Sequence, residues 1–471
     1  MSYDLIIKSA RVATAADVVP ADIGIRDGVI ATLGRDLSQD LGEAAEVIDA
    51  TGLLALPGGI DSHVHIAQPS GPNVVMADDF ESATRAAAFG GNTTVLPFCL
   101  PEEGQTLRAA VDAYHAKARG NCHIDVSFHL IVNRTDPRTL GQDLPALLEA
   151  GHTSFKVFMT YPGMRLTDRE ILDVMAVAKR HGAMVMVHAE NEDAIDFLRE
   201  GAERAGDTGP YFHAATRPVP VEREATHRAI TLAEIAGVPL TIVHVSNGAA
   251  LDEIRRGRAR GARVYAETCP QYLTLTADDL DRVDFDGAKY VCSPPPRDAA
   301  NQAACWAGLE QGDFELYSSD HCPFLFLSPE GKDTAGARDS FRHIPNGIPG
   351  VETRLPILFS EGVGKGRLDL TRFVAVTATN HAKLYGLYPR KGTIAVGSDA
   401  DIVLWDPERR ETIRQAALHH GSDYTPWEGF EVTGWPVVTL LRGRVVVRDG
   451  ALVDAARRGT HLTRDLPGHP F

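Results

Sequence analysis

Several features that mark other classes of protein are missing from this sequence. No stretch of 18 consecutive residues is apolar, so we expect no membrane span. The first residues lack a basic segment followed by a long apolar run, so we expect no signal peptide. The net charge is −16 and Lys and Arg form no dense cluster, which argues against nucleic acid or an anionic membrane as a partner. The six cysteines include no CxxC pair, which is typical of reduced thiols in a cytoplasmic protein.

The chain does contain three regions with different patterns of apolar residues. Residues 1–54 hold short strands and an Asp27-Gly28 hairpin turn, without catalytic spacing. In residues 55–385, short apolar strands alternate with helical patterns, and a β pattern returns in residues 386–471. We therefore predict an α/β protein with a (β/α)8 TIM-like barrel and a small β-sandwich domain formed by the two terminal segments, since neither segment alone has enough strands to bury a face. We expect the tail from about Gly450 to be loosely structured, either as a subunit-contact arm or as a frayed end.

The barrel region contains eight candidate strands separated by helical segments. Two of these helices are predicted at Asp79–Phe89 and Asp168–His181, and the second opens with Thr167-Asp168-Arg169-Glu170, a capping-box pattern. The expected strands are Gly59–Ile66, Thr93–Phe98, Ile124–Leu130, Ser154–Thr160, Met184–Ala189, Leu240–Ser246, Arg263–Thr268 and Phe314–Ser319.

Two histidines stand one residue apart at the end of the first barrel strand. Side chains alternate between the faces of a strand, so His63 and His65 point the same way and form the first half of a possible metal site. Because the chain has 18 histidines, such a pair is weak evidence by itself. His181 and His227, on helical segments, are interpreted as structural.

Four more polar residues lie in or after other apolar strands. Lys156 stands inside the fourth strand, His188 and His244 stand at the ends of the fifth and sixth, and Asp320 follows the eighth. In a barrel of this kind the catalytic groups lie at the carboxyl ends of several strands, so we expect all four beside the histidine pair. A buried ammonium is strongly disfavoured unless it is paired or neutralised, and burial lowers the pKa of a lysine until its neutral amine can react.

The order of these six residues resembles the ligand order of the amidohydrolase superfamily. The flanking segments resemble its cyclic-amidase branch, that of D-hydantoinase and dihydropyrimidinase, and they cover nearly the whole chain. These segments are Asp79-Phe80-Glu81-Ser82, Lys156–Tyr161, Glu267–Tyr272, Cys292–Pro295, Ser319–Cys322, Ile344–Gly347, Gly386–Gly392 and Tyr424–Phe430.

The resemblance implies a binuclear centre that holds two divalent metal ions, with zinc as the expected ion. Lys156 would be carboxylated on its side-chain nitrogen by carbon dioxide and would bridge the two metals as an anion. The remaining ligands would be His63, His65 and Asp320 at one metal and His188 and His244 at the other.

The resemblance also implies hydrolysis of the cyclic amide bond of dihydropyrimidines or 5-substituted hydantoins to N-carbamoyl amino acids. A hydroxide between the metals would be the nucleophile, with Asp320 as general base and then general acid. Tyr161 would donate a hydrogen bond to the developing oxyanion. Ser293 and Asn346 would hold the amide groups of the substrate ring, largely through backbone atoms. We expect a homo-oligomer, a tetramer or a dimer.

The segment Ile66–Pro72 departs from the pattern of this family. Ser70 stands where relatives have an aromatic residue that lines the pocket for the substrate's side chain, so the preferred side chain and enantiomer stay open. Ala67 stands where dihydroorotases carry an Arg, which argues against that activity. An allantoinase-type ureide hydrolase is one alternative, although the three substrate-binding positions favour the hydantoinase branch. A non-catalytic scaffold of the same fold is another, and the complete ligand set argues against it.

Overall fold

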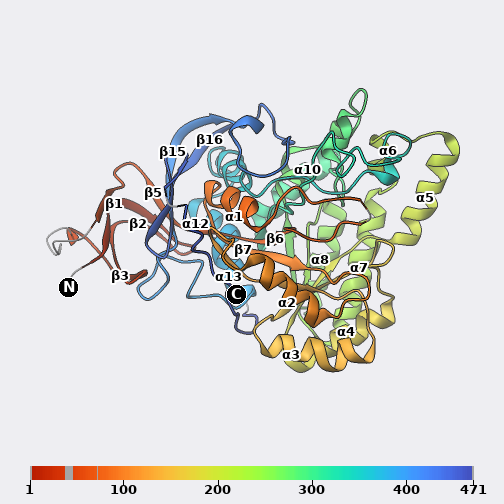
Figure 1. The fold of residues 1–471 in the computed structure, drawn as a ribbon, viewed down its shortest axis with the longest axis horizontal. Helices are drawn as coiled ribbons and strands as arrows, with labels where there is room; N and C mark the ends of the chain where they lie inside the picture. The colour runs from red at the N-terminus through yellow and green to blue at the C-terminus, as the bar shows by residue number, and fades with distance from the viewer. Residues whose placement is uncertain (1–2, 38–45, 72, 454, 469–471) are drawn as a thin grey trace.

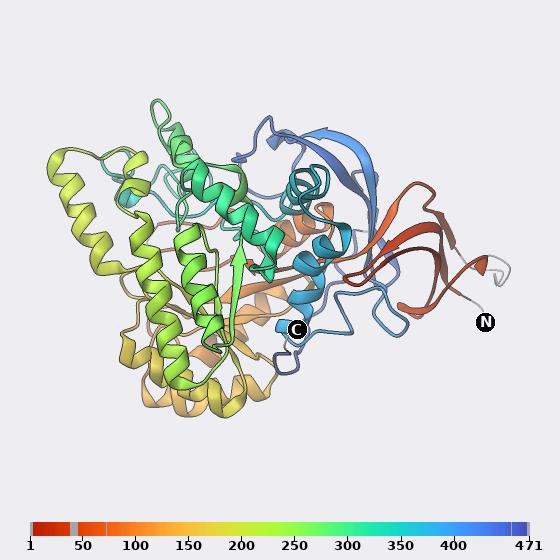
Figure 2. The same cartoon turned by 180° about the vertical axis from the view of Figure 1, so that it is seen from behind.

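A parallel barrel surrounded by helices lies beside a separate sheet in the structure, a computed structural model (Figure 1). The structure describes residues 3–37, 46–71, 73–453 and 455–468. Seen from behind, the helices surround the barrel and the N-terminal strands form the far side of the second sheet (Figure 2). Within the described ranges, no helix is long and apolar enough to cross a membrane.

The predicted (β/α)8 barrel is confirmed, and each of the eight expected strands is present. The third is divided into β8 and β9, and the strands pair in parallel in the order β6-β7-β9-β10-β11-β12-β13-β14, with β8 on β7. A bridge between Val64 and His321 closes the barrel, and the His65 amide donates to the His321 carbonyl at 2.7 Å. The strands are β6 (Gly59–Val64), β7 (Asn92–Cys99), β8 (Asp125–Val126), β9 (His129–Ile131), β10 (Ser154–Phe158), β11 (Met184–His188), β12 (Leu240–Ile242), β13 (Val264–Thr268) and β14 (Leu316–Tyr317).

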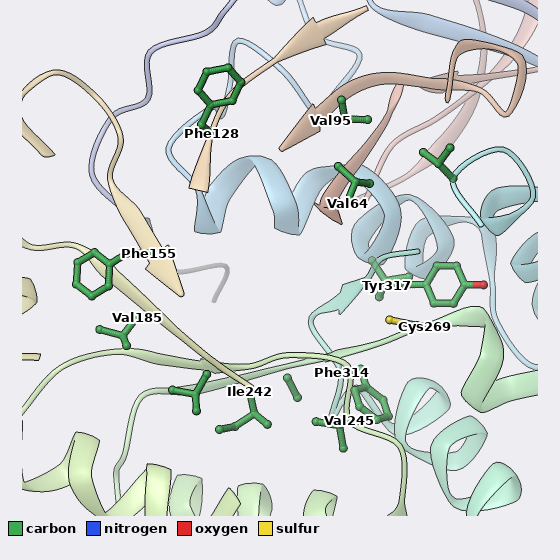
Figure 3. Close-up of a cluster of buried hydrophobic side chains, with 14 of the residues drawn as sticks. Val64, Val95, Phe128, Phe155, Val185, Ile242, Val245, Cys269, Phe314 and Tyr317 are labelled. Carbon is green, nitrogen blue, oxygen red and sulfur yellow. The ribbon is translucent and has the colours of Figure 1, made fainter. Parts of the chain in front are cut away.

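Alternate side chains of the barrel strands face different partners. In Figure 3, Phe155, Val185 and Ile242 lie on neighbouring strands, and all three belong to the large apolar cluster that also contains helix residues. Met184 and Met186 belong to a second apolar cluster inside the barrel. Because side chains alternate with period two, Lys156 and His188 face the barrel interior, opposite to their neighbours Phe155 and Val185.

The helices cover the outside of the barrel. The predicted helix Asp168–His181 is confirmed as α4: the Thr167 side chain accepts from the Glu170 amide, Glu170 accepts in return, and Gly182 ends the helix with φ of 70°. Asp79 caps α1 in the same reciprocal way with Ser82. The α-helices are α1 (Phe80–Phe89), α2 (Leu107–Ala118), α3 (Leu144–Glu149), α4 (Asp168–His181), α5 (Glu192–Ala205), α6 (Tyr211–Ala215), α7 (Val219–Ala236), α8 (Gly248–Ala259), α9 (Pro270–Thr274), α10 (Ala299–Gln311), α11 (Arg354–Leu358), α12 (Leu370–Val374) and α13 (Asn380–Leu384).

The terminal segments join in one small domain, as predicted. Its strands form a single hydrogen-bonded sheet in the order β18-β17-β16-β15-β5-β1-β2-β3, with β4 on β1. The antiparallel pairing of β5 with β15 connects the two ends of the chain, and Ile7, Ile402 and Leu440 share one apolar core. The strands are β1 (Leu5–Ala13), β2 (Val18–Arg26), β3 (Val29–Gly34), β4 (Glu46–Asp49), β5 (Leu54–Pro57), β15 (Ile402–Thr412), β16 (Glu431–Leu441), β17 (Arg444–Arg448) and β18 (Ala451–Leu452).

The expectation of a loosely structured tail is wrong for residues 459–468. Backbone hydrogen bonds fix this segment along the barrel: the Leu462 amide donates to Val126 at 2.8 Å and the Arg464 amide to Gly151 at 3.2 Å. Both ribbon views draw the dark-blue C-terminal segment beside the barrel rather than at the outer strands (Figures 1 and 2). No local pattern in the sequence indicates these contacts, because pairing between backbone atoms leaves no side-chain pattern.

Candidate metal centre and active site

The six predicted ligands come together at the carboxyl ends of the barrel strands. One trio consists of His63, His65 and Asp320, each of which offers one ligand atom within 4.8 Å of the other two. Asp320 Oδ1 lies 3.1 Å from His63 Nε2 and 3.4 Å from His65 Nε2. These atoms come from β6, the residue after it and the loop after β14, which adjoin one another where the barrel closes.

A second pair of imidazoles lies next to the trio. His188 Nδ1 and His244 Nε2 face each other at 2.9 Å; His188 is the last residue of β11 and His244 follows β12. Burial lowers the pKa of both histidines, and for His244 the neighbouring His188 and Lys156 lower it further, so both rings are neutral at neutral pH. His244 Nδ1 is buried and has no hydrogen-bond partner among the described residues.

Lys156 lies between these two groups inside the barrel. Its Nζ is 2.9 Å from His63 Nε2, and the side chain is fully buried between the rings of Phe98 and Phe158. Burial lowers the pKa of Lys156 to about 8, although Asp320 and Glu267 oppose that shift. A neutral, nucleophilic amine is therefore readily populated at this position.

Three acceptors on the far side of the histidine rings were missed in the sequence analysis. His63 Nδ1 contacts Glu267 Oε1 at 2.5 Å, His65 Nδ1 contacts Gln68 at 2.6 Å, and His188 Nε2 contacts Glu190 at 2.8 Å. Each acceptor fixes the outer ring nitrogen as the donor, so the inner nitrogen carries the lone pair. Glu267 and Glu190 were detectable in principle, because each is an acidic residue at or just beyond the end of an apolar strand.

A cavity of about 1070 Å³ opens over these residues. Asp320 is part of its wall together with the predicted substrate-binding residues Tyr161, Ser293 and Asn346. Burial raises the pKa of Tyr161 well above its usual value, and contacts with Ser293 and Asn346 oppose the shift only in part, so the phenol keeps its proton and can donate it in a hydrogen bond. The Tyr161 amide is held by Glu192 at 2.8 Å.

Three of the site residues have backbone conformations that L-amino acids rarely adopt. The φ angles are 75° at Tyr161, 41° at His244 and 51° at Asp320. Each such conformation costs about 1–3 kcal/mol and persists only where the surrounding structure enforces it, which occurs most often at active sites. The folded barrel is therefore less stable by this cost, and the three side chains are oriented toward the site.

The segment 66–71 after β6 lines the cavity and turns sharply. Ala67 has a φ of 48° and its carbonyl accepts from Lys117 at 3.0 Å, while Ser70 donates to the Gln68 carbonyl at 3.1 Å. Lys117, Gln68 and Ser70 all lie on the cavity wall. The last residue of the predicted variable segment, Pro72, lies outside the described residues.

The donor set fits two divalent transition metals. Four imidazoles and one carboxylate are the nitrogen and oxygen ligands that zinc prefers, and three of the four rings have their outer nitrogen occupied by an acceptor. The orphaned Nδ1 of His244 lies outside this pattern. Lys156 fits as a ligand only after it has been converted to an anion, because an ammonium would repel the metals.

Comparisons with known proteins agree with this geometry. A sequence profile of the Amidohydrolase family matches residues 54–446. The chain is 48% identical to the D-hydantoinase of Rhizobium radiobacter over 463 residues, which are 98% of this chain and 99% of the relative. A solved D-hydantoinase structure superposes with a TM-score of 0.95 at 45% identity, covering 98% of this chain and 99% of the other.

The chain belongs to the D-hydantoinase/dihydropyrimidinase family of cyclic amidohydrolases. The structure of the dihydropyrimidinase from Brevibacillus agri NCHU1002 is equally similar, with a TM-score of 0.95, 44% identity and 99% of each chain covered. The amidohydrolase profile begins in β5 and ends in β17, so the likeness includes the small sheet as well as the barrel.

Proposed function

We propose that this cyclic amidohydrolase opens the ring of 5-substituted hydantoins and dihydropyrimidines at an amide bond and releases N-carbamoyl amino acids. The observation that carries the proposal is the convergence of six candidate ligands at one cavity, five of which line it, while three of the histidines have the outer ring nitrogen fixed by an acceptor. Full-length relatives named D-hydantoinase and a structural neighbour named dihydropyrimidinase support the substrate class.

The six ligands would hold two divalent ions, most simply zinc. Ions bound there would polarise the amide carbonyl and lower the pKa of water enough to supply hydroxide at neutral pH. His63, His65 and Asp320 would hold one ion, and His188 and His244 the other. Lys156 would connect them as a carbamate, formed when its neutral amine attacks carbon dioxide and loses a proton. The lowered pKa of Lys156 supports this step because it raises the fraction of neutral amine.

Asp320 would transfer the protons. Burial raises its pKa, but His63, His65 and His244 more than offset that effect and hold the pKa well below its usual range, so the carboxylate is ionised at neutral pH. An ionised carboxylate on the cavity wall can accept a proton from the attacking nucleophile and return it to the departing ring nitrogen.

Tyr161 would stabilise the negative charge that develops on the carbonyl oxygen of the substrate. Its protonated phenol lies on the cavity wall, and its ring centroid is 5.2 Å from that of His188. Ser293 and Asn346 would orient the ring amides on the same wall. Planar cyclic amides present one donor and one acceptor per amide, so backbone groups are well suited to bind them.

Two further features belong to the proposal. We infer a homo-oligomer, a tetramer or a dimer, by analogy with the family. We also infer a cytoplasmic enzyme, which is supported by the six cysteines, all within the described ranges and none in a disulfide.

A kinetic panel tests the proposed function. The purified enzyme should hydrolyse hydantoin, dihydrouracil and at least one enantiomer of 5-phenylhydantoin, with much lower activity on allantoin. Preference for allantoin would assign the protein to the ureide hydrolases instead. Protein without bound metal and without activity on any of these compounds would support a scaffold.

A further inference from the structure

Three histidines outside the cavity converge on one point. They are His115 in α2, His152 just before β10 and His461 in the C-terminal segment. One ring nitrogen of each lies within 4.8 Å of the other two. The ring centroids are 4.3 Å apart for His115 and His461, and 5.3 Å apart for His152 and His461.

This cluster lies at the opposite end of the barrel from the cavity. His152 precedes the first residue of β10, whereas the candidate active-site residues follow the carboxyl ends of the strands. His461 forms a backbone bridge with Val126 in β8, a strand that likewise begins at the amino-terminal end of the barrel. The cluster is therefore a separate feature from the binuclear site.

Two of the three rings have a nitrogen that is left without a partner. His152 Nδ1 and His461 Nε2 are buried and make no hydrogen bond to the described residues. Leaving a buried polar atom unsatisfied costs about 1–3 kcal/mol, so native structures usually provide a partner. Burial lowers the pKa of His152 and of His461 to about 3, which leaves both rings neutral and their lone pairs available.

The backbone holds the three positions in place. On either side of His461, the Gly459 amide donates to Cys122 at 2.9 Å and the Leu462 amide donates to Val126 at 2.8 Å. The ring of Phe128 packs against the cluster, with centroid distances of 4.8 Å to His461 and 4.9 Å to His115. A site built on elements fixed in this way needs only side-chain rotation to close around an ion.

We propose that His115, His152 and His461 bind one divalent transition-metal ion of the zinc class and clamp the C-terminal segment to the barrel. Zinc–nitrogen bonds of about 2.0–2.1 Å in tetrahedral geometry place the nitrogens about 3.4 Å apart, so the rings close by roughly 1 Å. His115 and His461 are partly exposed, which leaves a fourth position for water. Three imidazoles without an anionic oxygen disfavour calcium or magnesium, which depend on oxygen ligands.

Metal stoichiometry of the full-length protein tests this site. The protein is stripped with a chelator, reconstituted with excess zinc, separated from free metal by gel filtration, and analysed for zinc per chain. His461→Gln and His115→Gln should each hold one equivalent less than the wild type. The matched control His227→Gln, which alters an exposed histidine on α7 paired with Glu253, should hold as much as the wild type. Equal stoichiometry in the wild type and His461→Gln would overturn the proposal.

The same comparison in a Lys156→Ala background separates this site from the binuclear centre. His461→Gln should still remove one equivalent there, whatever Lys156→Ala does to the metals in the cavity. The melting temperature separates metal binding from simple packing of the rings. The difference in melting temperature between the wild type and His461→Gln should disappear once both proteins are stripped of metal. A difference that persists unchanged without metal would mean that the three rings only pack together.

Discussion

The buried carboxylate of Glu267 offers the sharpest test of how the structure prepares its metal ligands. Glu267 accepts from His63 Nδ1 at 2.5 Å, from the His244 amide at 3.1 Å and from the Ser318 hydroxyl at 2.8 Å. Glu267→Gln keeps the shape of the side chain and an acceptor oxygen but removes the charge. We expect weaker metal binding and lower activity, because His63 loses the anion that makes its inner nitrogen more basic.

The magnitude follows from these three hydrogen bonds. A hydrogen bond to a charged group contributes about 1.5–3 kcal/mol and one to a neutral group about 0.5–1.5 kcal/mol, so each bond weakens by about 1 kcal/mol. The bond from His63 alone gives a lower limit of about 1 kcal/mol, and all three together give an upper limit of about 3 kcal/mol. These limits correspond to about a 5- to 150-fold loss of metal affinity. This range includes the loss of affinity usually seen when the hydrogen-bond partner of a metal ligand is replaced.

The assay is competition for zinc with a chelator of known affinity, together with kcat/KM on hydantoin. A matched control is Glu352→Gln, because Glu352 is also buried and also pairs with a histidine, His419, at 2.8 Å. This control should lose stability without losing metal affinity. Wild-type affinity and wild-type kcat/KM in Glu267→Gln would refute the reasoning.

Three further predictions follow from the site and its surroundings. Lys156→Ala should lose the bridging ligand, which metal analysis measures. It should also lose at least 10³-fold in kcat, on the order expected when a transition-state contribution is removed, when turnover is measured without added short carboxylates. Asp320→Asn should keep the fold, shown by an unchanged circular dichroism spectrum, yet lose about 10²–10⁴-fold in kcat because both proton transfers need its carboxylate. Burial lowers the pKa of His381 from 6.5 to about 3. Between these two pH values the histidine is protonated in the unfolded chain but not in the folded protein, so the free energy of unfolding falls as the pH drops from 6.5 toward 3. Urea denaturation across this range should show His381→Gln losing about 1.4 kcal/mol less per pH unit than the wild type.

Each of these predictions has an outcome that contradicts it. Near-normal turnover in Lys156→Ala would exclude the carbamate bridge, and the exposed Lys179→Ala on α4 is the control for loss of a lysine. Residual activity of Asp320→Asn within a few-fold of the wild type would assign the proton transfers to another group. If the free energy of unfolding fell equally steeply with pH in His381→Gln and the wild type, this histidine would be protonated in the folded protein as well.

Much of the fold was readable from local patterns. The short apolar runs that alternate with helical patterns predicted every barrel strand, and the Thr167–Glu170 capping box predicted the first turn of α4. Both signals are local, since they depend on residues within one element. The irregularity that divides the third strand into β8 and β9 was not predicted, because apolar and polar residues alternate without a break from Ile124 to Leu130.

The residues of the candidate site likewise fall into those that the local sequence indicates and those that only the fold reveals. His63, His65 and His188 were visible because an imidazole at the end of an apolar strand is conspicuous. Gln68 was not, because a glutamine in a loop carries no signal until the ring of His65 is seen to contact it. The ordered position of the C-terminal segment along the barrel was the feature least expected from the sequence, because its pairing with Val126 depends on backbone atoms alone.

The sequence by itself determined the barrel and the six candidate ligands, because the alternation of strands with helices and the chemistry of the residues at the strand ends are local features of the chain. The reaction class came from the resemblance of its motifs to the amidohydrolases. Only the tertiary structure decided which atoms of those ligands converge and which neighbours fix them. It also decided that His115, His152 and His461, which are hundreds of residues apart at the extremes, meet at one point. The physical reason is that hydrogen bonds and metal sites depend on distances of a few ångströms, and only the folded barrel sets those distances.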